Sequence, residues 1–135
     1  VYQTCAEFSY FQTTDSSEQP FSKFLPLQYY YAQCDAAYGT NPIMRPRIDQ
    51  TNAIYGGKRY RGTRTHFSNG SIDPWHALGI TSASDLPSSN SVTFIQGTAH
   101  CADLYGPTAS DSAALVSARA TQASILHEWL ESFDP

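Results

Sequence analysis

Two ionisable side chains follow short β-like segments in the second half of the chain. Asp73 comes shortly after THFSNG, and His100 comes directly after SVTFIQGTA. Ligands of open α/β sheets bind outside the carboxyl ends of the strands, so an acid and a histidine on consecutive strands would meet where such sheets carry out chemistry. Their types and order match the last two members of a Ser-His-Asp triad as α/β-hydrolases arrange it.

The chemistry expected of this pair is proton transfer. The carboxylate of Asp73 would accept a hydrogen bond from Nδ1–H of His100, fix the tautomer of the imidazole and stabilise the imidazolium that forms when the histidine takes a proton from a serine. The nucleophile would then lie upstream of both residues. No Gly-x-Ser-x-Gly segment, the turn that presents such a serine, occurs in the 135 residues.

Simpler interpretations exist for both residues. Asp73 stands in NGSIDPW, where Asn-Gly and Asp-Pro are typical of turns, and its carboxylate could cap backbone amides. His100 could be a core histidine or a metal ligand, and His66, His76 and Asp103 offer further ligand types. No HExxH or other helical ligand spacing accompanies them, so we expect neither a metal site nor a cofactor.

The remaining histidines have less specific settings. His66 lies inside a strand segment and is expected to pack there, whereas His127 lies on the last helix and is expected to face solvent. His76 is close to Asp73 in sequence, which makes it a candidate loop contact and a weaker rival as the base. Asn69 begins a glycosylation sequon, Asn-Gly-Ser, but a glycan is not expected in a tight functional turn.

The composition is that of a sparsely charged globular protein. Hydrophobic residues make up 41% and charged residues 15%, with a net charge of −4. No apolar run is long enough for a membrane span, and the negative charge disfavours nucleic acid because phosphate binding needs a basic face. Six of the eight basic residues fall within twenty positions: Arg45, Arg47, Lys58, Arg59, Arg61 and Arg64. A solvated surface segment is favoured over an anion site, because no glycine-rich phosphate loop accompanies them.

Residue patterns in the first half predict one strand and two helices. Residues 1–14, rich in Val, Tyr, Phe and Thr, are predicted to form a buried strand. Apolar residues three and four apart predict a helix within residues 21–38, with Pro26 in its first turn and Gly39 at its end. Residues 45–62 give mixed signals that are compatible with a short helix closed by a glycine pair.

The second half predicts the elements that carry the acid and the histidine. Residues 63–70 and 91–97 are predicted to be strands. A nearly continuous apolar stripe over residues 115–133 predicts a closing helix, and Thr108 with Asp111 resembles its capping box. We expect this helix to pack on the sheet beside the strand that bears the histidine.

Three cysteines are present, Cys5, Cys34 and Cys101, which leaves one over if two of them pair in an extracellular protein. The start of the chain lacks the basic head and apolar run of a signal peptide. The odd cysteine count, the abrupt start and the missing nucleophile predict a segment of a longer polypeptide or one chain of a processed protein.

Four segments of the chain carry a family resemblance: FSNGSIDPWHALG, GTAHCADLY, YQTCAEF and NAIYGG. They resemble the C-terminal portion of the lysosomal Pro-Xaa carboxypeptidase family, whose relatives include dipeptidyl peptidase II and thymus-specific serine protease. The resemblance runs from residue 2 to about residue 133, is nearest to the thymus-specific and invertebrate branch, and includes a specific motif pair, NGxxDPW followed by GxAHxxD. It implies that residues 1–135 are the C-terminal segment of an α/β-hydrolase peptidase domain, secreted or lysosomal.

The same resemblance implies roles for individual residues. Asp73 would be the triad acid and His100 the triad base, and a disulfide would join Cys5 to Cys34 and leave Cys101 as the odd thiol. The family's nucleophile elbow and its inserted helical domain are absent from this chain. The resemblance therefore implies a serine exopeptidase that favours cleavage after proline, whose serine lies on a companion chain or an upstream segment.

The expected partners are this serine-bearing segment and a peptide substrate, and a homodimer is left open. The isolated chain should have no peptidase activity, because it holds two of the three triad members. The alternative is a non-catalytic fragment or descendant that acts as a structural or interaction protein. Its aromatic content of 13% would suit either an interface or the rest of a hydrolase core.

Overall fold

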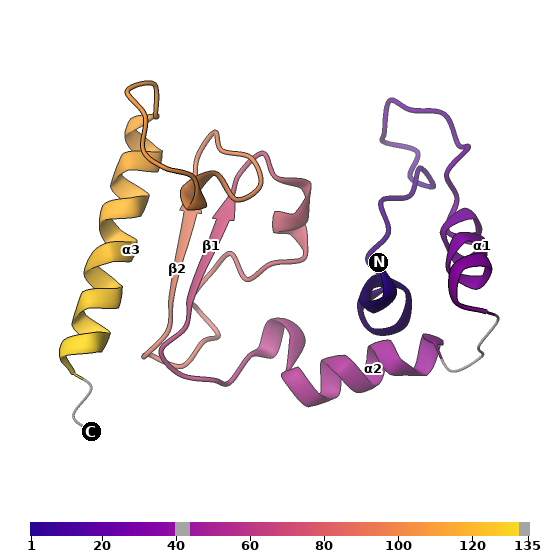
Figure 1. Cartoon of the computed structure of the whole chain (residues 1–135), viewed down its shortest axis with the longest axis horizontal. Helices are drawn as coiled ribbons and strands as arrows, with labels where there is room; N and C mark the ends of the chain where they lie inside the picture. Colours follow the sequence, from indigo (N-terminus) through magenta and orange to yellow (C-terminus); the bar gives the residue numbers. More distant parts are fainter. Residues whose placement is uncertain (40–43, 133–135) are drawn as a thin grey trace. The chain divides into compact units, whose positions relative to one another are not determined.

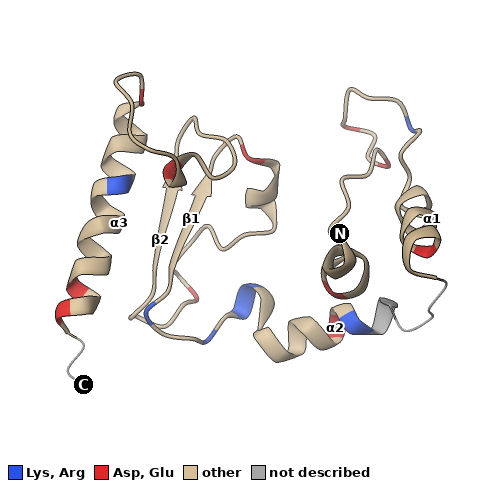
Figure 2. Ribbon diagram, viewed as in Figure 1, with Lys and Arg blue, Asp and Glu red and all other residues tan. Residues whose placement is uncertain are grey.

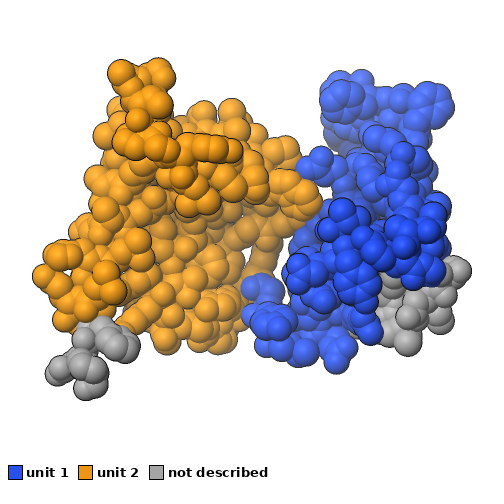
Figure 3. Space-filling model, in the orientation of Figure 1, with its two compact units in different colours: residues 1–57 blue, residues 58–135 orange. Residues whose placement is uncertain are grey.

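The computed structural model describes residues 1–39 and 44–132. The chain divides into two compact units, residues 1–57 and residues 58–135 (Figure 3). No helix among the described residues is long and apolar enough to cross a bilayer.

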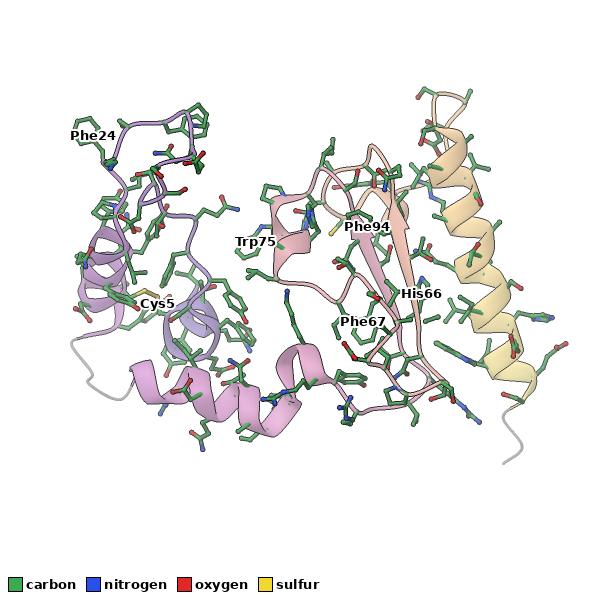
Figure 4. All side chains as sticks on the ribbon, turned by 180° about the vertical axis from the view of Figure 1, so that it is seen from behind. Cys5, Phe24, His66, Phe67, Trp75 and Phe94 are labelled. Atoms are coloured by element: carbon green, nitrogen blue, oxygen red, sulfur yellow. A yellow bond between two sulfur atoms is a disulfide. The ribbon has the colours of Figure 1, made fainter. Side chains whose placement is uncertain are left out.

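Helices form the first unit. Its elements are η1 (Thr4–Phe8, a π-helical turn), α1 (Leu27–Tyr38) and α2 (Met44–Tyr55), as Figure 1 shows. A disulfide joins Cys5 in η1 to Cys34 in α1, and both residues are buried (Figure 4). Aromatic rings pack nearby, with Phe11 stacked on Tyr30 at a centroid distance of 5.1 Å.

The predicted strand over residues 1–14 is wrong, because this segment forms η1 and an irregular loop. The backbone bonds of η1 are made locally, from Cys5 N–H to the Val1 carbonyl and from Ser9 N–H to the Thr4 carbonyl. Aromatic and β-branched residues favour a strand only where a neighbouring strand packs beside them, and the described residues offer no such neighbour here.

The first predicted helix begins later than its apolar pattern indicated. Pro26 is the residue before α1 and is extended, with ψ of 165°, so its predicted place in the first turn is wrong. The cause lies upstream, where Leu25 exchanges hydrogen bonds with Thr14 and is held outside the helix. The end at Gly39 is confirmed, with a left-handed φ of 81°.

The glycine pair after α2 ends that helix as expected. Gly56 and Gly57 both have positive φ, 84° and 52°, and η2 (Gly57–Arg59) follows directly. Glycine adopts such angles at no steric cost, which is why the helix ends here.

A small parallel sheet organises the second unit. Strands β1 (His66–Gly70) and β2 (Ser91–Ile95) pair in register, from His66 opposite Ser91 to Gly70 opposite Ile95. Short 3-10 helices follow each strand, η3 (Pro74–Ala77) after β1 and η4 (Ala102–Leu104) after β2. Both predicted strands are therefore confirmed, and each is followed by one of the ionisable residues.

The closing helix α3 (Ala113–Glu131) packs against β2, as expected (Figure 1). The contact is a cluster of the buried side chains Ile95, Leu115 and Ala118. Further along the same apolar stripe Leu130 is 74% exposed, so the first half of the helix makes the core contact.

The predicted capping box lies one turn too early. Ser112 caps α3 by accepting a hydrogen bond from Leu115 N–H, whereas Thr108 and Asp111 bond to each other in a separate turn before the helix. The pattern identified a real side-chain motif, but Ser112 was the residue placed to bond the first free amide of the helix.

Candidate active site

The turn after β1 fixes the position of Asp73. Asp73 is the N-cap of η3, and its Oδ1 accepts the Trp75 N–H at 3.0 Å. Its own N–H bonds the Gly70 carbonyl at 3.2 Å, which closes the turn back onto the end of the strand. The predicted capping function of this carboxylate is therefore real, and it uses only one of the two oxygens.

The second oxygen of Asp73 meets His100. Asp73 Oδ2 and His100 Nδ1 lie 2.7 Å apart. The Asp73 side chain is 9% exposed, whereas that of His100 is 66% exposed. No hydrogen bond to Nε2 of His100 is found within residues 1–39 and 44–132, and the side chain that carries this nitrogen is largely exposed.

Several interactions set the charge of Asp73. Burial acts to raise its pKa, but hydrogen bonds from His100 and from the Trp75 amide, with the positive charge of His100 and His76, outweigh burial and lower the pKa below its usual value. An ionised carboxylate only accepts hydrogen bonds, so Nδ1 of His100 carries the proton. In the neutral imidazole Nε2 is then unprotonated and can act as a base.

Backbone bonds between the two loops bring the acid and the histidine together. Ser71 N–H bonds the Ile95 carbonyl at 3.0 Å, and Ile72 N–H bonds the Thr98 carbonyl at 3.1 Å. The Ser71 hydroxyl accepts from Gly97 N–H at 2.8 Å. Because the strands are parallel and in register, both loops leave the same edge of the sheet and continue the pairing beyond the strand ends.

Gly70 permits this close approach. A Cβ at this position would lie 2.4 Å from the Thr98 carbonyl oxygen and 2.7 Å from the Ala99 carbonyl oxygen. Both contacts are with backbone, so the loop that carries His100 can approach β1 only if residue 70 has no side chain. Sequence reasoning treated the Asn69-Gly70 pair as a turn signal and missed this function of the glycine.

The other histidines lie away from the Asp73 carboxylate. His76 donates from Nδ1 to the backbone carbonyl of Asp73 at 2.7 Å, and its ring packs edge-on against Phe94. His76 is therefore a contact within the loop. The residue that reaches the Asp73 carboxylate is His100. His127 is 73% exposed and pairs with Glu131, as its predicted solvent-facing position requires.

His66 is a partly buried residue at the start of β1. Its Nδ1 lies 2.7 Å from the Ser91 hydroxyl, and its Nε2 is buried with no hydrogen-bond partner among the described residues. Burial lowers the pKa of His66, and the negative charge of Asp103 offsets part of this effect. This residue is thus a neutral packing histidine, as its strand position predicted.

The remaining candidates do not form a ligand site. Within the described residues no group of three or more His, Cys, Asp or Glu side chains is arranged to hold a metal ion. Among the clustered basic residues, Lys58 donates to the Ala77 carbonyl and Arg61 to the Asp85 carbonyl. The side chain of Arg45 lies outside the described residues.

Two further residues, the sequon asparagine and the cysteine that is not in the disulfide, lie close in sequence to the acid and the histidine. Asn69 donates its amide to the Ile80 carbonyl at 2.8 Å, so the sequon nitrogen is engaged within the fold. Cys101, directly after His100, is a partly buried free thiol whose backbone has a left-handed φ of 58°.

Comparison with known proteins finds relatives that are described as serine proteases or carboxypeptidases. Residues 1–122 match the model of the family described as serine carboxypeptidase S28. The chain is 43% identical to the Caenorhabditis elegans protein named "Putative serine protease K12H4.7", over 98% of this chain and 27% of that protein. It is 34% identical to the thymus-specific serine protease of Mus musculus, over 97% of this chain and 26% of the relative. It is 28% identical to the lysosomal Pro-X carboxypeptidase of Bos taurus, over 98% of this chain and 26% of that relative.

The chain spans about a quarter of the length of these relatives. Its mixed helices and small parallel sheet are consistent with a fragment of the α/β-hydrolase fold of this family. The match covers both units, including the Asp73 and His100 loops. The chain belongs to the serine carboxypeptidase S28 family.

Proposed function

We propose that this chain supplies the acid and the base of the Ser-His-Asp triad of a serine exopeptidase. The observation that carries the proposal is the 2.7 Å contact between Nδ1 of an exposed His100 and a carboxylate oxygen of a buried Asp73. A buried carboxylate orients the ring, and Nε2 of the exposed side chain is left to reach a nucleophile. Neither a turn cap nor a packing histidine requires this arrangement.

The mechanism follows from the two ends of the imidazole. A serine hydroxyl would attack the peptide carbonyl while Nε2 of His100 takes its proton, and Asp73 would stabilise the imidazolium through Nδ1–H. His100 would then give the proton to the leaving amine. Backbone amides beside the nucleophile would stabilise the oxyanion of the tetrahedral intermediate.

The serine would come from an upstream segment or a companion chain. Two facts support this: no Gly-x-Ser-x-Gly segment occurs in the chain, and the chain spans about a quarter of the length of its relatives. Residues 1–135 would then be the C-terminal segment of the peptidase domain, without its helical insert, and would be inactive alone.

The substrate would be a peptide with proline before the cleaved bond. The name of one relative, lysosomal Pro-X carboxypeptidase, supports this preference. A secreted or lysosomal location is supported by the Cys5–Cys34 disulfide, since such bonds form and persist in oxidising compartments.

Labelling of the complete enzyme with a fluorophosphonate tests the proposal, because this probe reacts with an activated serine. His100→Ala should abolish labelling, since the serine then has no base. The matched control is His127→Ala, which removes an exposed histidine on α3 and should label at the parent rate. Continued labelling of His100→Ala would mean that the base has been misassigned.

The proline preference has its own test. Cleavage of peptide pairs that differ only by proline or alanine before the scissile bond should favour proline in kcat/KM. A native enzyme in which no serine is labelled would refute the peptidase proposal and leave the alternative, a non-catalytic interaction protein. That alternative draws support from exposed apolar side chains such as Phe24, which is 84% exposed (Figure 4).

A further inference from the structure

The guanidinium of Arg119 bonds the backbone directly after His100. Arg119, the blue segment of α3 in Figure 2, donates from Nη2 to the Ala102 carbonyl at 3.0 Å and from Nε to the Asp103 carbonyl at 3.2 Å. Both carbonyls belong to η4, which begins two residues after His100. A side chain on the closing helix therefore holds the turn that leads away from the histidine.

Asp111 fixes the orientation of this guanidinium. It accepts a short, charge-assisted bond from Nη1 of Arg119, and the two side chains are 11% and 18% exposed. The Thr108 amide and hydroxyl, followed by Arg119, hold the pKa of Asp111 at about 2, so the carboxylate stays ionised at neutral pH. A planar guanidinium bonded at three nitrogens has little freedom to turn, unlike a lysine ammonium.

Asp103 ties the same turn to the sheet. Its carboxylate accepts from Gln122 Nε2 at 2.6 Å, and the same amide nitrogen contacts the Ser68 hydroxyl of β1 at 3.1 Å. The turn after His100 is thus attached both to α3 and to the strand that precedes Asp73. These attachments use the backbone and side chain of η4 and leave the imidazole itself untouched.

The backbone beside His100 has a conformation that needs such support. Cys101 lies between His100 and η4 with a φ of 58°, which is uncommon for residues other than glycine. Conformations of this kind persist where the surrounding structure holds them. The ring of His100 is itself two-thirds exposed, and its hydrogen bond among the described residues is to Asp73, so its position depends on where this backbone is held.

We propose that Arg119 is a positioning residue for His100, which acts by fixing the carbonyls of Ala102 and Asp103 and thereby the distance between the imidazole and Asp73. The inference rests on the proposed function for its catalytic consequence. Its structural part, the control of the His100–Asp73 contact, can be measured without any catalysis.

The kinetic test uses Arg119→Met in the complete enzyme, which keeps much of the side-chain length but has no donors. The fluorophosphonate labelling rate per folded molecule should fall by about 100-fold, the size of effect that a misplacement of about 1 Å produces. Arg119→Lys keeps the charge, but its single nitrogen cannot reproduce the planar fork of three nitrogens that donates to Ala102, Asp103 and Asp111, and it should recover only part of the rate. Arg59→Met removes an exposed arginine of η2 and should leave the rate unchanged.

The spectroscopic test follows the Nδ1–H resonance and the titration of His100 by NMR with labelled histidine. Both should change in Arg119→Met and stay at the parent values in Arg59→Met. An unchanged resonance and titration, or a labelling rate per folded molecule within twofold of the parent, would overturn the positioning role. If Arg119→Met does not fold, the same readings are taken on Arg119→Lys. A parent enzyme that never labels would refute the proposed function, while the NMR comparison would still decide the role of Arg119.

Discussion

Substitution of Gly70 by alanine should separate the acid from the histidine without touching either residue. The added Cβ would meet the Thr98 carbonyl oxygen at 2.4 Å, whereas real Cβ contacts begin at 3.0–3.4 Å. The loop that carries His100 must therefore retreat by about 0.6–1.0 Å, because both strand and loop contribute backbone that cannot rotate away. Added in full to the present 2.7 Å, a shift of this size would lengthen the Nδ1–Oδ2 distance to about 3.3–3.7 Å, longer than the usual N–H···O hydrogen bond of about 2.7–3.2 Å.

The expected result is a fall of about 100-fold in the fluorophosphonate labelling rate of the complete enzyme. Overpacking should also cost about 1–3 kcal/mol in the free energy of unfolding, measured by urea titration. Gly106→Ala is the matched control, because a Cβ there meets nothing within 4 Å and should change neither quantity. Labelling of Gly70→Ala at the parent rate per folded molecule would refute the argument that Gly70 sets the approach of the two loops.

Three further predictions concern the charge, the buried histidine and the disulfide. Asp73→Asn in the complete enzyme should lower the labelling rate by about 10⁴-fold with little change in fold, as a neutral triad acid does elsewhere; a loss of less than tenfold would contradict the assigned role. Burial lowers the pKa of His66 from 6.5, so the unfolded chain takes up a proton there before the folded chain does. The free energy of unfolding should therefore fall as pH drops from about 6.5 towards the folded pKa. His66→Gln should remove this contribution to the pH dependence of the free energy of unfolding, measured by urea titrations at several pH values. An unchanged pH dependence in His66→Gln would contradict the prediction. Replacing Cys5 and Cys34 by serine opens a loop with a sequence separation of 29 and should cost about 3–4 kcal/mol, measured by denaturant unfolding; equal midpoints with and without the bond would refute this.

Local residue patterns predicted the second unit well, because its strands and its closing helix form where the local sequence favours them. The short β-like segments before Asp73 and His100 identified both strands, and the apolar stripe from Leu115 identified α3. In-register parallel pairing then brings the two following loops to one edge of the sheet. The contact between acid and histidine follows from this topology.

In three places the deciding contact is distant in sequence, which is why the residue pattern did not reveal it. A strand over residues 1–14 was predicted from aromatic and β-branched residues, but Cys5 is joined to α1 and has no strand beside it. Pro26 was placed inside a helix because its own pattern fits, while Thr14 holds the preceding residue outside. Arg119 gave no signal, since its partners in η4 are backbone carbonyls that any residue carries.

The two oxygens of Asp73 have separate partners, and this division determines what an amide could do in the same place. Oδ1 receives the Trp75 N–H and Oδ2 receives Nδ1–H of His100. An asparagine would place its single oxygen where it accepts the hydrogen bond of the Trp75 N–H, and its NH₂ group would then point towards His100. Nδ1 would then have to accept, and the imidazole proton would move to Nε2. A change of one atom, from oxygen to nitrogen, would thus leave the turn intact and convert the outward nitrogen of His100 from a proton acceptor into a proton donor.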